Sequence, residues 1–124
     1  MPSWVSPPNF ALLQQYFSLK SLEPYQEHAE DASLLIQTLR LTDYLGMYRF
    51  QERFINEMIT PSIRVGNCVL FLEETHRKLK NQENGSQCWY SLLNASITFL
   101  ALHLREVYKA SADKLKRLHE KILN

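Results

Sequence analysis

The sequence predicts an all-α fold, a bundle of about six helices joined by short connections. Apolar residues recur at helical spacing through most of the chain, and no long stretch shows the two-residue alternation typical of strands. Three glycines among 124 residues are also too few for turn-rich β-architectures or for glycine-rich phosphate loops. The length suits a single domain with a modest core.

The first predicted helix is short. Residues 1–8 hold three prolines and are expected to be irregular, and residues 20–28 contain Pro24 and are expected to form a loop. Between them, residues 9–19 carry large apolar side chains near helical spacing, namely Phe10, Leu13, Tyr16 and Phe17. This pattern predicts a short amphipathic helix.

Two helices are predicted over residues 31–45 and 47–59, with Gly46 between them. Gly46 stands where a helix commonly ends in the left-handed conformation, which glycine adopts without steric cost. Pro61 disfavours helical geometry at Thr60 and therefore ends the second helix. Two helices with almost no loop between them must form a tight hairpin or corner.

The second half of the chain predicts three more helices. One spans residues 68–80 with Asn67 as its N-cap, and another spans residues 87–106. A last helix begins at Ser111. The helix at 87–106 has the longest apolar stripe and is predicted to be the central helix of the bundle. The residues at the middle of that stripe should be almost fully buried: Leu93, Ile97 and Leu100.

Composition and motifs argue against several classes of function. A net charge of +1 is low for a dedicated nucleic-acid binder, and no apolar run is long enough to cross a membrane. Neither a zincin-type pair of ligands nor a nucleophile elbow is present, and the four histidines lie far apart. We therefore expect no catalytic residue, no metal and no cofactor. Cys68 and Cys88 are expected to be reduced, buried thiols, which suits a cytoplasmic or nuclear protein.

One stretch interleaves aromatic and basic residues. Such a cluster either stacks on nucleic-acid bases or anchors a protein partner, and the low net charge favours a protein. Its helical spacing predicts that Phe50 and Phe54 belong to the core, which leaves Arg49 and Arg53 on a solvated stripe and Tyr48 as the best surface anchor. With two residues from other segments, the candidate partner-binding residues are Tyr16, Tyr48, Arg49, Arg53 and Phe71.

Residues 30–59 resemble the closing helices of a BTB/POZ domain. The resemblance rests on a leucine-rich helix ending in Asp-Tyr-Leu and on apolar positions of the next helix: Leu34, Leu35, Leu41, Asp43, Tyr44, Leu45, Phe50, Ile55 and Ile59. Residues 67–73, Asn-Cys-Val-Leu-Phe-Leu-Glu, are similar to the opening of the BACK region that commonly follows a BTB domain. The front half of a BTB domain has no counterpart here.

The resemblance implies an organisation and a role. Residues 1–8 would be an irregular lead, residues 9–60 BTB C-terminal-like helices and residues 61–124 a BACK-like helical region, and we expect them to form one compact unit. BTB–BACK proteins commonly bridge a cullin scaffold to substrates for ubiquitination, and residues 55–80 would form part of the cullin-binding surface. The alternative is a stand-alone small helical scaffold with an unrelated protein partner.

The missing front half has a consequence for residues 9–45. In a BTB domain the corresponding helices cover a sheet that this chain does not contain. We therefore expect residues 9–45 to be less stable than residues 67–123, and to need a partner or to self-associate.

Overall fold

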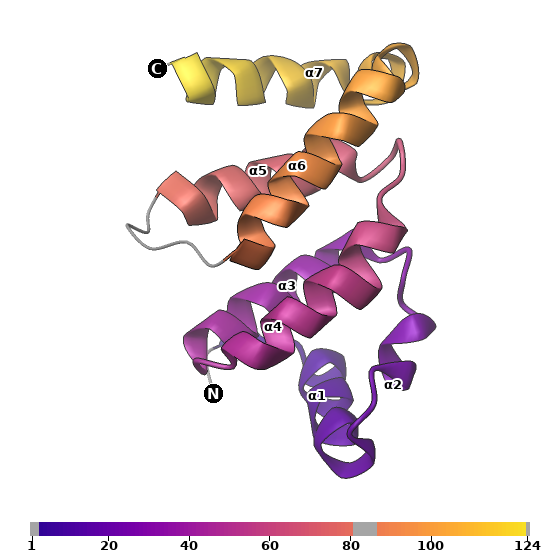
Figure 1. Ribbon diagram of the computed structural model, residues 1–124, viewed down its shortest axis with the longest axis vertical. Coiled ribbons are helices and arrows are strands. Elements are labelled where there is room, and N and C mark those ends of the chain that lie inside the picture. Colours follow the sequence, from indigo (N-terminus) through magenta and orange to yellow (C-terminus); the bar gives the residue numbers. More distant parts are fainter. Residues whose placement is uncertain (1–2, 81–86, 124) are drawn as a thin grey trace. The chain divides into compact units, whose positions relative to one another are not determined.

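The computed structural model describes residues 3–80 and 87–123 and confirms the all-α class over that part of the chain (Figure 1). Its seven α-helices, with one π-helical and one 3₁₀ turn, exceed the predicted six because a short helix replaces an expected loop. The chain divides into two compact units, Met1–Ser62 and Ile63–Asn124, and each is described by itself.

In the first unit, α1 spans Pro7–Leu19 and α2 spans Glu23–Gln26. The Ser6 hydroxyl caps α1 by accepting from the Asn9 amide at 3.4 Å, and α1 ends at Lys20, whose φ of 52° is left-handed. The single turn of α2 lies in the segment that was expected to be a loop. It exists because it buries Tyr25 completely in the core of this unit.

The next helices meet at a corner, as the sequence predicts. α3 spans Ala32–Tyr44, and its N-terminus is capped by Asp31, whose carboxylate accepts from the Leu34 amide at 3.1 Å. Gly46 follows with a φ of +71°, and α4 spans Tyr48–Phe54. The helix then widens into a π-helical turn, Ile55–Ile59, and tightens into a 3₁₀ turn, Thr60–Ser62. The predicted effect of Pro61 on Thr60 is wrong, because Thr60 keeps helical angles, φ −56° and ψ −46°, and the chain accommodates the proline in the 3₁₀ turn.

An aromatic cluster forms the core of this unit. The Tyr25 ring lies 5.0 Å from Phe54 and 6.0 Å from Phe50, in edge-to-face contacts. Leucines of α1 and α3 and the apolar residues of the π-helical turn complete the core: Leu12, Leu13, Leu35, Leu39, Leu41, Ile55, Met58 and Ile59. The predicted stripe on residues 47–59 is therefore confirmed as core.

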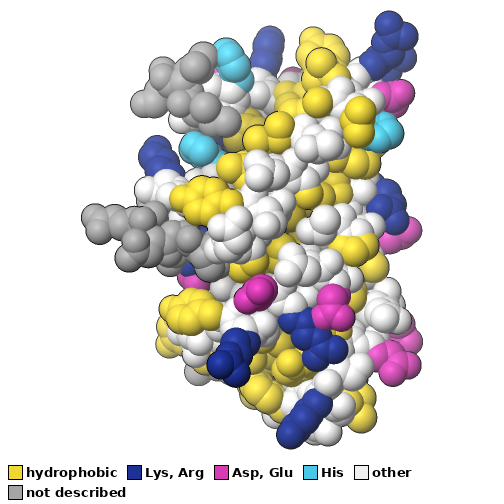
Figure 2. All heavy atoms as spheres, viewed as in Figure 1, with side chains coloured by type: hydrophobic (Ala, Val, Ile, Leu, Met, Phe, Trp, Pro, Cys, Tyr) yellow, Lys and Arg dark blue, Asp and Glu magenta, His cyan; other side chains and the backbone are white. Residues whose placement is uncertain are grey.

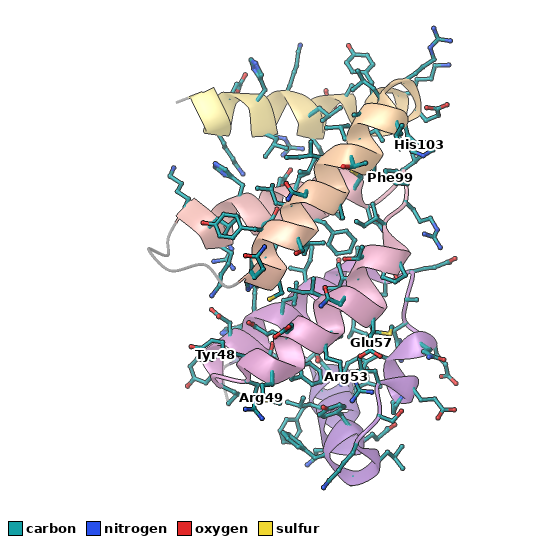
Figure 3. The ribbon with its side chains drawn as sticks, in the orientation of Figure 1. Tyr48, Arg49, Arg53, Glu57, Phe99 and His103 are labelled. Carbon is teal, nitrogen blue, oxygen red and sulfur yellow. The ribbon has the colours of Figure 1, made fainter. Side chains whose placement is uncertain are left out.

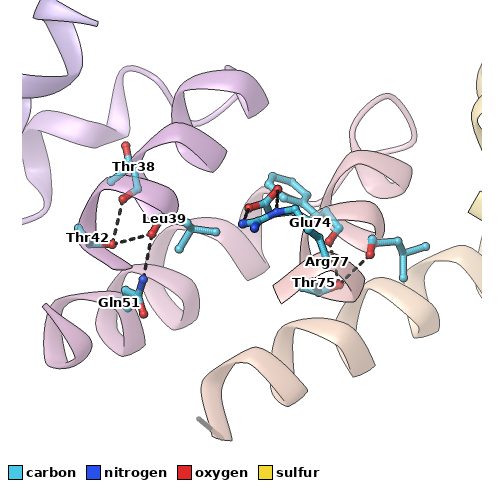
Figure 4. Close-up of polar contacts among 9 residues, drawn as sticks. Thr38, Leu39, Thr42, Gln51, Glu74, Thr75 and Arg77 are labelled. Carbon is cyan, nitrogen blue, oxygen red and sulfur yellow. Dashed lines mark hydrogen bonds and ion pairs between the residues drawn. The ribbon is translucent and has the colours of Figure 1, made fainter. Parts of the chain in front are cut away.

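Buried polar side chains fix how these helices pack. Asn9 on α1 donates to Gln37 Oε1 at 3.1 Å, and the Thr38 hydroxyl donates to Asn9 Oδ1 at 3.1 Å, so α1 is tied to α3. Gln51 on α4 donates through Nε2 to the Leu39 carbonyl at 2.9 Å (Figure 4). Because these groups are buried, leaving any of them unpaired would destabilise the unit.

The second unit holds three helices: α5 (Cys68–Lys80), α6 (Gln87–Leu102) and α7 (Leu104–Leu123). α5 packs against both α6 and α7 (Figure 1). The Asn67 carbonyl accepts the first helical bond of α5, as an N-cap residue does. The core comes from all three helices: Cys68, Val69, Phe71, Leu72, Cys88, Trp89, Leu92, Val107 and Leu118. The ammonium of Lys78, itself buried, lies 5.6 Å from the Trp89 ring centroid.

The predicted full burial of Leu93, Ile97 and Leu100 on α6 is wrong. Leu93 and Leu100 are only partly buried, and Ile97 is 48% exposed. α6 instead packs through the row Cys88, Trp89, Leu92 and Ser96. The row with Leu93, Ile97 and Leu100 is apolar too, but the core contains the row that faces α5.

The predicted ends of the last two helices also differ from the structure. α6 stops at Leu102 rather than at residue 106, and α7 starts at Leu104. Ser111 interrupts α7 with non-helical angles, φ −143° and ψ 34°, so two helical segments meet there at a kink. The predicted helix start at Ser111 coincides with this break.

Candidate protein-binding surface

The outer face of α4 carries three of the predicted partner-binding residues. Tyr48 is 62% exposed, and Arg49 and Arg53 are exposed one helical turn apart (Figure 3). They point outward because Phe50, Gln51 and Phe54 occupy the inner face of the same helix. The sequence prediction of a solvated arginine stripe beside a buried phenylalanine stripe is confirmed at these positions.

Arg53 is held in place by two neighbours. Its guanidinium donates to the Glu57 carboxylate at 2.6 Å, one turn further on (Figure 3). The hydrogen bond to Glu57, then the charge of Glu57, raises the pKa of Arg53, and a hydrogen bond to Tyr16 adds to this effect. Both partners of the ion pair are about half exposed, so the pair orients the guanidinium more than it stabilises the fold.

Tyr16 connects α1 to this face. Its ring lies edge-to-face on Phe50 at 4.6 Å, so the apolar part is half-buried while the hydroxyl meets Arg53. Tyr16 therefore contributes to the surface with its polar tip. The structure brings Tyr16, Arg53 and Glu57 together from two helices.

Arg49 has no such support. Its side chain has no ion pair or hydrogen bond among the described residues, and it lies between Tyr48 and Arg53 on the exposed face. An exposed arginine without an internal partner is available to a carboxylate of another molecule.

Phe71 does not belong to this surface. It is fully buried in α5 of the second unit, among the residues that pack against the other helices of that unit. The reason is that α5 is apolar over a broad face, and spacing alone does not show which of its large side chains is outermost. Phe71 is therefore a core residue and not an anchor for a partner.

Three exposed apolar residues near Tyr48 were not predicted as site residues: Trp4, Tyr44 and Leu45. Trp4 meets Tyr44 edge-to-face at 6.5 Å, and Tyr44 is 66% exposed. With Tyr48 they form the α3–α4 corner, defined here as Trp4, Tyr44, Leu45 and Tyr48. Gly46, which is left-handed between α3 and α4, marks this corner in the sequence but does not indicate which side chains there are exposed.

The described residues show neither a group of metal ligands nor a helix suited to cross a membrane. Within residues 3–80 and 87–123, no three side chains of His, Cys, Asp or Glu are grouped as metal ligands. None of the helices in the same ranges has the length and apolar character that a bilayer crossing requires. Cys68 and Cys88 are buried thiols that form no disulfide among the described residues.

Comparisons with models of known families, with curated proteins and with solved structures found no match to this chain.

Proposed function

We propose that this chain is a non-enzymatic protein-interaction module of the BTB–BACK type, which links a cullin scaffold to substrates of a ubiquitin ligase. The observation that carries the proposal is the exposed surface formed by the α3–α4 corner and the outer face of α4. Tryptophan, tyrosine and arginine are the residues that most often dominate binding energy at protein interfaces, and this surface combines all three.

The order of the helices supports the BTB–BACK assignment over an unrelated scaffold. A helix pair joined tightly at Gly46 is followed by a helix starting after Asn67 and packed against the next helix, α6. This is the order that the resemblance implies. The stretches that carry the resemblance fall on α3, α4, the π-helical turn and the start of α5.

The surface favours a partner with carboxylates around an apolar patch. Arg49 has no ion pair or hydrogen bond among the described residues, and Arg53 is oriented by Glu57 and Tyr16. Aromatic side chains supply the buried contact area, and the arginines supply direction and charge.

Affinity purification of the tagged full chain from cells, followed by mass spectrometry, tests the proposal. We expect a cullin to be recovered with the wild type, and recovery to fall about tenfold or more for Tyr48→Ala with Arg49→Glu. Tyr90→Ala with Lys116→Glu is the matched control, since it removes one exposed tyrosine and reverses one exposed cation outside residues 55–80. Absence of a cullin with the wild type, or equal loss in both variants, contradicts the adaptor role.

The second candidate is a stand-alone helical scaffold with an unrelated partner. It is favoured by the aromatic core of the first unit, in which α1, α2 and α3 pack against α4 without any sheet. A non-cullin protein that is recovered with the wild type and lost with the Tyr48 and Arg49 variant would establish this alternative.

We propose a cytoplasmic or nuclear location for the protein. The two thiols are buried and form no disulfide among the described residues, as is common in reducing compartments. Imaging of a fluorescent fusion tests this, and enrichment in the secretory pathway would contradict it.

A further inference from the structure

The second unit has an exposed patch where α6 meets α7. We define this α6–α7 patch by its residues, Leu102, Leu104, Arg105, Tyr108 and Lys109, all of which are exposed. Leu102 is 75% exposed, more than any other large apolar side chain described. In Figure 2, hydrophobic side chains gather along α6 toward this end, and Lys or Arg side chains stand beside them.

Local structure explains why these residues face outward. The helix turns at His103, whose ring stacks on Phe99 one turn earlier at 4.3 Å (Figure 3). In the first two turns of α7 only Val107 is buried, so this part of the helix is held through one side chain. The remaining side chains of those turns are free to meet another molecule.

The patch has an ordered arrangement of apolar and basic side chains. Leu104 and Tyr108 are four residues apart and lie on one face of α7. Arg105 and Lys109 form the neighbouring row, about 100° further round the helix. Glu106 lies another step beyond and therefore points away from the apolar row.

The two cations of the patch have no partner among the described residues. Neither Arg105 nor Lys109 makes a side-chain hydrogen bond or ion pair among the described residues. The exposed apolar side chains of the patch therefore lie beside cations that have no counter-charge among the described residues. An acidic ligand that also carries apolar side chains would satisfy both rows at once.

We propose that the α6–α7 patch binds an acidic amphipathic peptide segment of a protein partner. Two apolar side chains of the segment, one helical turn apart, contact Leu104 and Tyr108, and its carboxylates pair with Arg105 and Lys109. The proposal rests on the second unit alone and does not depend on cullin binding by the α4 surface.

A peptide suits the patch better than a nucleic acid. Leu102 and Leu104 are aliphatic and offer no aromatic face for a base, so Tyr108 is the only stacking ring in the patch. Two cations beside Glu106 also make a weak footprint for a phosphate backbone. The same two cations are sufficient for the carboxylates of a short peptide.

The test uses the full chain and labelled twelve-residue peptides in fluorescence anisotropy. The acidic probe has leucine at every third or fourth position and glutamate elsewhere, and the matched probes carry glutamine or lysine in place of glutamate. We expect the acidic probe to bind most tightly, the glutamine probe more weakly and the lysine probe least. Added salt should weaken binding of the acidic probe.

Variants locate the site. Arg105→Glu with Lys109→Glu should weaken binding of the acidic probe about tenfold, because two attractive pairs become repulsive. Lys116→Glu with Lys121→Glu changes the charge equally on exposed positions of the same helix and should leave binding nearly unchanged. Leu104→Ser with Tyr108→Ser should weaken the acidic and the glutamine probes alike. Circular dichroism of each variant confirms that the helices remain.

Several results would overturn the proposal. No binding of the acidic probe below millimolar concentration, equal binding of the three probes, or equal loss in the two charge variants would each do so. A labelled oligouridylate that binds more tightly than the acidic probe would make the patch a nucleic-acid site. A change in sedimentation of the chain alone on Leu104→Ser with Tyr108→Ser would make it an interface between two copies.

Discussion

The side chain of Tyr25 fills the core of the first unit, but it also buries a hydroxyl group, which costs stability. Its ring fills the space between Phe50 and Phe54, yet its hydroxyl is buried and finds no hydrogen-bond partner among the described residues. Burial, and then the nearby Tyr16, raises the pKa of Tyr25 well above its ordinary value.

Removal of this hydroxyl should not destabilise the protein. Tyr25→Phe keeps the ring and deletes the unpaired polar atom, so we expect the free energy of unfolding to stay equal or rise by about 1 kcal/mol. Urea unfolding measures this, with Tyr48→Phe as the exposed control. A loss of more than about 1 kcal/mol would show that the hydroxyl has a partner in solution.

The buried thiol of Cys68 should make the stability of the folded protein depend on pH. Burial raises the pKa of its thiol, and the sulfur lies 3.4 Å from the Ser96 carbonyl. The unfolded chain ionises this thiol near its ordinary pKa of about 8.5, while the folded protein keeps it protonated. The contribution is therefore fully present below about pH 8.5 and is lost as pH rises through the folded value.

Unfolding in urea between pH 7 and about pH 9.5 checks this expectation. Stability should fall over the upper part of the range, and Cys68→Ala, although less stable throughout, should show a shallower fall. A slope that is unchanged in Cys68→Ala would mean that other groups cause it.

At the scale of elements, α6 illustrates a helix with two apolar rows. One row, Trp89, Leu92 and Ser96, is buried, and the other, which includes Leu93 and Ile97, is not. The effect of a substitution on stability should therefore depend on which row of α6 it lies in. The apolar pattern of the sequence does not indicate which row is buried.

Alanine substitutions on the two rows provide the measurement. Leu92→Ala should lower the free energy of unfolding by about 2–5 kcal/mol, because a fully buried side chain leaves a cavity. Ile97→Ala should change it by less than about 0.5 kcal/mol. Comparable losses at both positions would mean that α6 packs on both rows in solution.

The turn between α3 and α4 has a similar local test. Gly46 has a φ of +71°, and a Cβ there would meet no atom within 4 Å, so the cost of Gly46→Ala is one of backbone strain alone. We expect a loss of about 1 kcal/mol. Gly66→Ala is the matched control, since that glycine is also uncrowded and lacks a positive φ, and it should be neutral or slightly stabilising.

At the scale of the whole molecule, the two units differ in charge, and α1 of the first unit leaves aromatic side chains exposed. The first unit contains four basic and seven acidic residues, and the second contains ten and six. α1 in the first unit buries Asn9, Leu12 and Leu13 and leaves Phe10 and Phe17 exposed on its outer side. Exposed aromatic residues on a terminal helix suit contact with another molecule.

Hydrogen exchange tests how firmly α1 is held. In a dilute sample we expect the amides of α1 to exchange faster than those of α5, because α5 packs against two other helices. Slower exchange of α1 at high concentration, abolished by Phe10→Ser with Phe17→Ser, would demonstrate self-association through this segment. Equal, high protection of α1 and α5 in the dilute sample would contradict the expectation that residues 9–45 are the less stable part.

The sequence by itself determined the all-α class and most helix ends. These depend on local chemistry, such as the left-handed Gly46 that follows α3. It also determined the division of α4 into a phenylalanine face and an arginine face, because the outer positions of that helix are polar or charged and only one face is apolar.

Tertiary structure decided which apolar side chains are covered. On α5 and α6 apolar residues occupy more than one face, so periodicity shows that a helix forms but does not show which row meets a neighbour. Packing between helices buries Phe71 and Leu92 and leaves Ile97 exposed to solvent. Tyr25 lies in a segment expected to be a loop, and packing buries it in the core as well. These outcomes depend on residues distant in the sequence, whose packing no local pattern encodes.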